Sequence, residues 1–95
     1  MLGGFRSSQP ADNNIKELVK SQKQNIENKL EATFNVFEAV EYKQQVVAGM
    51  NYLIKIKVDN DEYLHVKIYV PLKQSNKPIL VLSASRGHTL YDNLN

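Results

Sequence analysis

The 95-residue chain contains no cysteine. Disulfide bonds therefore cannot stabilise its fold, although secreted chains of this size often need them. A thiol nucleophile, a zinc site with cysteine ligands and an iron–sulfur cluster are excluded for the same reason. The sequence also lacks any run of about 20 apolar residues, the length that a helix needs to cross a bilayer. We therefore expect no membrane partner.

Signals for export are absent as well. Residues 1–6 do not form the continuous apolar run of a signal peptide, and no asparagine has the spacing of an N-glycosylation site. Together with the missing cysteines, these features favour a cytoplasmic protein. The alternative is a secreted chain from which the signal peptide has been removed.

Side chains with catalytic or metal-binding chemistry are few. His65 is expected on the exposed polar face of a strand, and His88 has no carboxylate or second histidine at metal-ligand spacing. None of the serines lies in a Gly-x-Ser-x-Gly sequence. We therefore expect no catalytic residue, no metal and no cofactor, and we do not expect an enzyme.

The charge pattern gives little support to nucleic-acid binding. The formal net charge is +2, and lysines are interleaved with acids along the chain. Such a pattern is typical of a solvated surface rather than of a nucleic-acid-binding face. Tyr63 and Tyr69, expected to face outward among lysines, leave a small nucleic-acid-binding α+β domain as a competing reading. We expect no nucleic-acid partner.

The length fits one small domain over residues 1–95, and we see no internal boundary. Residues 1–11 contain glycine, serine and proline with little to pack, which predicts a flexible N-terminal arm. Asp12, Asn13 and Asn14 are all suitable helix N-caps. The apolar residues that follow keep a helical spacing and predict one long helix over residues 15–34. They are Ile15, Leu18, Val19, Ile26, Leu30 and Phe34.

After residue 35 the period changes to the alternation of β-strands. Apolar and polar residues alternate over residues 40–46, 52–58 and 64–70, and a further strand is expected over residues 79–84. The alternation places Val40 on the same face as Tyr42. The pattern predicts an α+β fold in which one long helix is wrapped by a four- to five-stranded antiparallel sheet. Residues 86–95 are expected to form a last edge strand or a docked tail.

The turn between the first two strands has an unusual composition. Gln45-Val46-Val47-Ala48-Gly49 is apolar where an exposed turn normally carries Asn, Asp, Ser or Lys. Uncovered valines at a turn indicate a surface that another molecule covers. The alternative is a hairpin in which the β-branched residues serve stability alone. We favour a binding function.

These residues, in their order along the chain, resemble the cystatin family. Gln45–Gly49 is similar to the first inhibitory hairpin of the cystatins, and segments 36–40, 65–69 and 76–78 resemble the type 1 cystatins, or stefins. The resemblance implies a cystatin-like fold. It also implies reversible, tight-binding, competitive inhibition of papain-like cysteine proteases such as the cathepsins, by a wedge of three parts that enters the protease cleft.

The resemblance assigns residues of this chain to the three parts of the wedge. They are Leu2, Gly3 and Gly4 in the arm, Gln45, Val46, Val47, Ala48 and Gly49 in the first hairpin, and Leu72 with Lys73 in the second hairpin. A core position at a strand end is the alternative for Leu72.

The second hairpin departs from the stefin pattern. Stefins usually have Leu-Pro there, whereas in this chain Lys73 occupies the place of the proline and Pro71 precedes the leucine. This departure leaves a non-inhibitory interaction module with the cystatin fold as the alternative function. For the oligomeric state we expect a monomer, with a domain-swapped dimer as the alternative.

Overall fold

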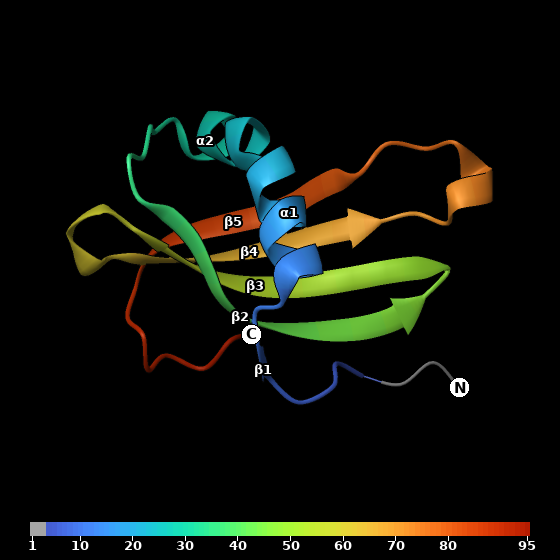
Figure 1. Ribbon diagram of the computed structural model, residues 1–95, viewed down its shortest axis with the longest axis horizontal. Helices are drawn as coiled ribbons and strands as arrows, with labels where there is room; N and C mark the ends of the chain where they lie inside the picture. Colours follow the sequence, from blue (N-terminus) through green and yellow to red (C-terminus); the bar gives the residue numbers. More distant parts are fainter. Residues whose placement is uncertain (1–3) are drawn as a thin grey trace.

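The structure, a computed structural model, describes residues 4–95. A five-stranded antiparallel sheet, in the order β1-β2-β3-β4-β5, is crossed on one face by two consecutive helices (Figure 1). The elements in chain order are β1 (Gln9–Pro10), α1 (Asn13–Ser21), α2 (Lys23–Leu30), β2 (Phe37–Val47), β3 (Gly49–Val58), β4 (Tyr63–Val70) and β5 (Leu80–His88), with 3₁₀ turns at Asp59–Asp61 and Lys73–Ser75. The predicted α+β class and the antiparallel sheet are confirmed.

The helical segment differs from the single helix predicted over residues 15–34. Asp12 is the N-cap, and its carboxylate accepts the N–H of Ile15 at 2.9 Å. Gln22 interrupts the helix with φ −104° and ψ 5°, which separates α1 from α2. The second helix ends where Glu31 adopts the left-handed conformation with φ 53°. Neither helix of the described chain is long and apolar enough to cross a membrane.

Phe34, the last apolar residue of the predicted helix, lies beyond α2 and is still buried, with 3% of its surface exposed. Its backbone N–H donates to the Glu27 carboxylate at 2.8 Å. Its ring lies 6.1 Å from the ring of Phe37, measured between centroids. The helical spacing of Phe34 therefore indicates burial correctly but not the end of the helix, because the chain turns back at Glu31.

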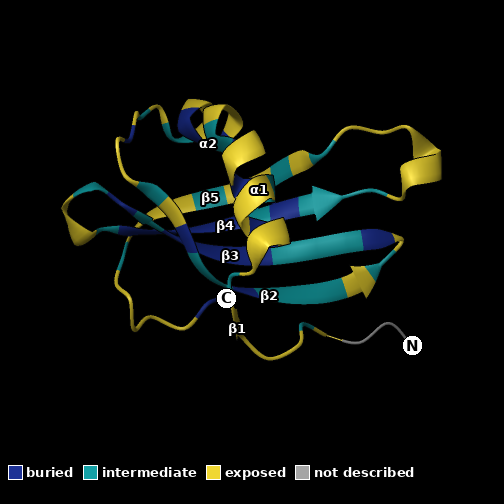
Figure 2. Cartoon of the chain, viewed as in Figure 1, coloured by how far each residue is buried: buried dark blue, intermediate teal, exposed yellow. Residues whose placement is uncertain are grey.

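The core lies between the helices and the middle of the sheet. Figure 2 shows the buried residues concentrated along the central strands beneath the helices. The apolar residues without exposed surface are Ile26, Ile54, Ile56, Leu64, Val66 and Ile68. The predicted alternation of β3 and β4 is therefore confirmed for the face that meets the helices, where apolar burial contributes roughly 25 cal/mol per Å².

One β-bulge changes the face assignment in β2. The register against β3 shifts between Ala39 and Glu41. As a result Ala39 joins Tyr42 in the core cluster, in place of Val40, which the alternation predicts beside Tyr42. An inserted residue of this kind is not visible in a pattern with a period of two.

The C-terminal tail, residues 89–95, covers part of the sheet face that points away from the helices. After β5 the chain folds back, and Leu94 is buried with 3% of its surface exposed. Figure 1 shows the tail returning below the strands toward the centre of the molecule. Lys55 and His65, both on the predicted polar face, are only 1% and 6% exposed. The tail encloses Lys55, whose Nζ donates to the carbonyl oxygens of Leu90 and Asp92, whereas His65 is stacked on His88 of β5. The prediction of an exposed His65 is wrong for this reason.

His65 is enclosed by charged and titratable groups. Its ring is stacked on His88, with centroids 3.7 Å apart and planes 6° apart, and its Nε2 has no hydrogen-bond partner among the described residues. Burial lowers the pKa of His65 to about 4. The positive charges of His88 and Lys55 act in the same direction, while Asp92 and Glu41 oppose the shift. His65 is therefore neutral in the folded protein at neutral pH.

We expect the free energy of unfolding to fall as the pH decreases from about 6.5, the ordinary pKa of histidine, to about 4. In this window the unfolded chain takes up a proton at His65 that the folded chain does not bind, so acid favours unfolding. His65→Phe keeps an aromatic ring against His88 but cannot be protonated. The urea midpoint of this variant should depend less on pH between about 7 and about 5. An equal pH dependence in the two proteins would contradict the assignment.

Candidate functional site

Two loops lie side by side at one end of the sheet, and the described N-terminal segment runs toward them along β2 (Figure 1). The β2–β3 turn lies there, and the pairing of Met50 with Val70 brings the β4–β5 loop, residues 71–79, alongside it. The N-terminal segment approaches the same end, because β1 pairs with β2 and the N–H of Arg6 donates to the Gln44 carbonyl at 2.8 Å. These are the segments that the resemblance assigns to a wedge.

The first hairpin presents apolar side chains to solvent. Val47 pairs with Gly49 across the turn, so Ala48 alone forms the tip. Val46 is 48% exposed, Ala48 is exposed, and Val47 is half-buried. The helices cross the middle of the sheet and do not reach this end (Figure 2). The valines are therefore not packed beneath the molecule's own helices.

Two side-chain hydrogen bonds hold the hairpin near its tip. The Asn51 amide donates to the Gln45 side-chain oxygen at 3.1 Å. The Tyr69 hydroxyl, on the neighbouring strand β4, donates to the carbonyl oxygen of Ala48. Because Tyr69 also pairs with Asn51 in the β3–β4 register, the tip is tied to two strands of the sheet. The turn is thus preformed in the free molecule.

Gly49 allows the first hairpin and the β4–β5 loop to touch. Its φ is +109°, a conformation that residues with a Cβ rarely adopt. A Cβ at this position would overlap the carbonyl oxygen of Val70 and lie 3.0 Å from the Cα of Pro71. Glycine is therefore required by the turn and also by the backbone packed against it.

The β4–β5 loop holds Leu72 at the surface. Leu72 is 45% exposed, so its alternative assignment as a core residue is not supported by its burial. Its carbonyl accepts both the N–H and the hydroxyl of Ser75, at 3.0 and 2.7 Å. Lys73 begins the 3₁₀ turn, is exposed, and takes part in none of the ion pairs of the described chain.

The N-terminal segment is described only in part. Leu2 and Gly3, which the resemblance assigns to binding, lie outside the described residues. Gly4 is exposed. Phe5 is half-buried on the outer sheet face, where the Lys67 ammonium lies 5.7 Å from the centre of its ring.

Tyr69 and Pro71 support the site, although the sequence pattern assigned them no role in it. Alternation places Tyr69 on the outer face of its strand, but the partner of its hydroxyl depends on the register between β3 and β4. The contact of Pro71 with Gly49 depends on the path of the loop after the strand. The sequence did contain a signal for this contact: a glycine next to an apolar turn and a proline at the end of a later strand.

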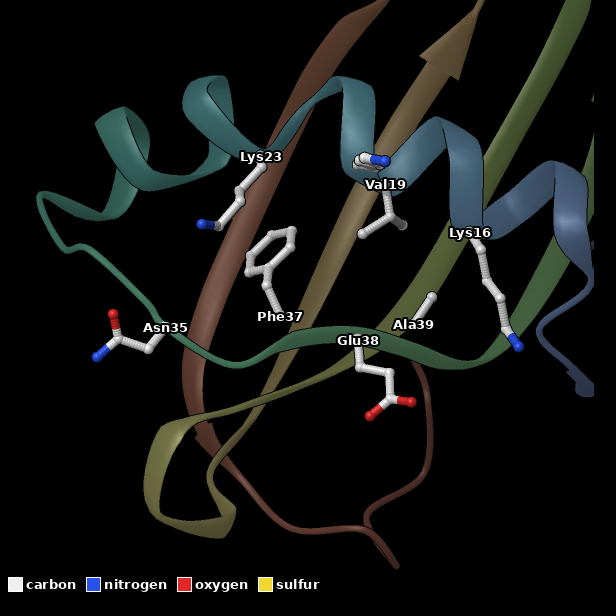
Figure 3. Close-up of a pocket in the computed structure, with 8 residues that line it drawn as sticks. Lys16, Val19, Lys23, Asn35, Phe37, Glu38 and Ala39 are labelled. Carbon is white, nitrogen blue, oxygen red and sulfur yellow. The ribbon is translucent and has the colours of Figure 1, made fainter.

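A cavity of about 340 Å³ lies between α1 and the start of β2, away from the hairpin tip (Figure 3). Val19 and Phe37 supply its apolar part, with Lys16, Lys23 and Glu38 among the polar residues around it. None of the predicted site residues lines this cavity. Within residues 4–95, no group of three or more potential ligand side chains could hold a metal ion.

Comparison with known proteins gives the family. The model of the cystatin domain matches residues 3–83, and the chain belongs to the cystatin family. Members of this family are inhibitors of cysteine proteases and not enzymes.

The relatives narrow the assignment to the type 1 cystatins, or stefins. Stefin-C of Bos taurus is 40% identical over 93 residues, which cover 98% of this chain and 92% of the relative. Cystatin-A1 of Sus scrofa is 44% identical over 79 residues, covering 83% of this chain and 77% of the relative. Cystatin-B of Sus scrofa is 38% identical over 94 residues, covering 99% and 96%. The predicted resemblance is confirmed.

Gly49→Ala should lower the free energy of unfolding by more than about 2 kcal/mol, because the added methyl group meets backbone atoms and φ is positive. Gly87→Ala is the matched control: its φ is +77°, but an added Cβ meets nothing within 4 Å. The control should lose only about 1 kcal/mol. Equal losses in urea unfolding would show that Gly49 does not hold the two loops together.

Proposed function

We propose that the chain is a reversible, tight-binding, competitive inhibitor of papain-like cysteine proteases of the cathepsin class. It would act through a wedge made of the N-terminal arm, the first hairpin and the β4–β5 loop. The observation that carries the proposal is the exposure of Val46 and Leu72, at 48% and 45%, on two loops at the same end of the sheet. Apolar side chains exposed together in this way favour a protein partner.

Inhibition without cleavage would follow from the shape of the hairpin. A papain-like protease attacks an extended peptide bond with a cysteine thiolate paired to a histidine. The tip at Ala48 is a closed turn, so it would fill the cleft without offering a peptide bond in the geometry that attack requires. Its hydrogen bonds from Tyr69 and between Asn51 and Gln45 reduce the conformational entropy that binding removes.

The arm is proposed to act mainly on dissociation. Leu2, Gly3 and Gly4 precede in the sequence the described segment, in which the N–H of Arg6 donates to the Gln44 carbonyl of β2. Contacts from such a segment would add to those of the preformed loops after docking. Differences of this kind between related complexes appear mostly in the dissociation rate.

Lys73 is proposed to affect which proteases are bound. It places a positive charge beside the exposed Leu72, so an acidic cleft rim would be favoured over a basic one. The alternative is that this lysine removes inhibition and leaves a non-inhibitory interaction module. We also infer a monomer that acts in the cytoplasm, since stefins are intracellular proteins.

Titration of active-site-counted papain should show stoichiometric loss of activity. Val46→Asp should weaken inhibition by at least about tenfold, because docking would bury an unpaired carboxylate in place of an apolar side chain. Val36→Asp is the matched control, because Val36 is 42% exposed but precedes β2 at the other end. It should inhibit like the parent. Papain that turns over normally at a large excess of the parent protein would support the non-inhibitory module.

Removal of residues 1–3 should raise the dissociation rate from papain and change the association rate little, because the arm would add its contacts after the loops have docked. Stopped-flow association and displacement by a second inhibitor measure the two rates separately. A truncated variant that dissociates from papain as slowly as the parent would show that the arm has no part in the mechanism.

A further inference from the structure

Lys55 is a buried lysine at the centre of the outer sheet face. It lies on β3 with 1% of its surface exposed. Its Nζ donates to the carbonyl oxygens of Leu90 and Asp92, each at 2.6 Å, and lies 3.0 Å from a carboxylate oxygen of Glu41. A buried ammonium needs such partners, because removing it from water is unfavourable. Its three protons have three acceptors, so no donor is left for a further ligand.

Glu41 connects this lysine to the N-terminal segment. One of its carboxylate oxygens faces Lys55, and the other accepts the hydroxyl of Ser8 at 2.5 Å. The hydrogen bond from Ser8 is the largest single cause of the lowered pKa of Glu41. Burial opposes the shift, and the hydrogen bond and the charge of Lys55 lower the pKa further. The carboxylate is therefore held in its charged form, which strengthens both contacts.

Ser8 lies in the N-terminal segment between two backbone contacts with β2. It lies between β1, which pairs with β2, and Arg6, whose N–H donates to Gln44 farther toward the hairpin tip. A polar cavity of about 390 Å³ borders Ser8, Glu41, Lys55 and the C-terminal tail. Polar contacts, rather than close apolar packing, therefore hold the segment here.

We propose that Lys55 is a positioning residue for inhibition. Through Glu41 and Ser8 it couples the docked C-terminal tail to the N-terminal arm, and so holds the arm in register along β2 on its way to the first hairpin. We call the side chains of Lys55, Glu41 and Ser8 the Lys55 relay. The effect on inhibition rests on the proposed function, whereas the coupling itself is a property of the free protein.

The first test uses the free protein. Ser8→Ala removes one exposed hydroxyl and leaves the core untouched, and Ser7→Ala is the matched control, because Ser7 makes none of the hydrogen bonds of the described chain. Solvent exchange of the Arg6 amide, measured by NMR, should be faster in Ser8→Ala and in Lys55→Met, and unchanged in Ser7→Ala. If Ser8→Ala exchanges at the same rate as Ser7→Ala, the relay is overturned, whether or not Lys55→Met folds.

The second test uses the complex with papain. In the full chain, Ser8→Ala and Lys55→Met should each raise the dissociation rate about two- to tenfold, the range expected for one hydrogen bond. The double variant should not exceed the larger single effect. In a chain that lacks residues 1–8, Lys55→Met should leave the dissociation rate unchanged.

The outcomes separate the relay from the proposed function. A Lys55→Met effect that persists without residues 1–8 would assign Lys55 a general structural role and overturn the proposal. Unchanged dissociation of Ser8→Ala in a chain that inhibits papain would overturn it as well. A parent protein that does not inhibit papain contradicts the proposed function alone, and the Arg6 exchange rates then decide the relay.

Discussion

The contact between Gly49 and the backbone of Val70 and Pro71 sets the relation between the two loops of the proposed wedge. A hairpin tip and a long loop would otherwise vary independently, because loops have few packing partners. Here the missing Cβ of Gly49 lets the end of β4 pack directly against the turn. The Tyr69 hydroxyl then reaches the Ala48 carbonyl. One glycine thereby lets two segments more than twenty residues apart pack against each other.

The position of the helices leaves that edge uncovered. α1 and α2 bury their apolar residues against the middle of the sheet, where the strands carry the residues with no exposed surface. The strands continue past the helices (Figure 1), and Val46, near the end of β2, is 48% exposed. Stability and the proposed binding are therefore served by different parts of the same strands.

The sequence predicts the elements of this fold better than their contacts. Strand alternation identified β3 and β4 and the faces that meet the helices, because their side chains follow a period of two. It could not show that Lys55 and His65 are buried, since their burial depends on the tail and on β5, both more than twenty residues away in the chain. The helix break at Gln22 lies in the polar stretch of residues 20–25, between Val19 and Ile26. The break is set by local backbone conformation, which the spacing of the apolar residues on either side does not show.

The residues of the candidate site were likewise easier to predict than the contacts between them. The apolar composition of Gln45–Gly49 marked the first hairpin, and the resemblance added Leu72. The sequence did not reveal why these residues lie together, because that depends on the pairing of Met50 with Val70 and on the space left by Gly49. Periodicity describes one strand at a time, whereas a binding edge is made by the register between strands.

Hydrogen–deuterium exchange of the complex with papain tests the central claim most directly. If the uncovered edge enters the protease cleft, amides of residues 45–51 and 71–76 should exchange more slowly in the complex than in the free protein. The 3₁₀ turn at Asp59–Asp61, at the opposite end of the sheet, should be unchanged (Figure 1). Slower exchange at that turn or over the helices, with residues 45–51 unaffected, would contradict the account.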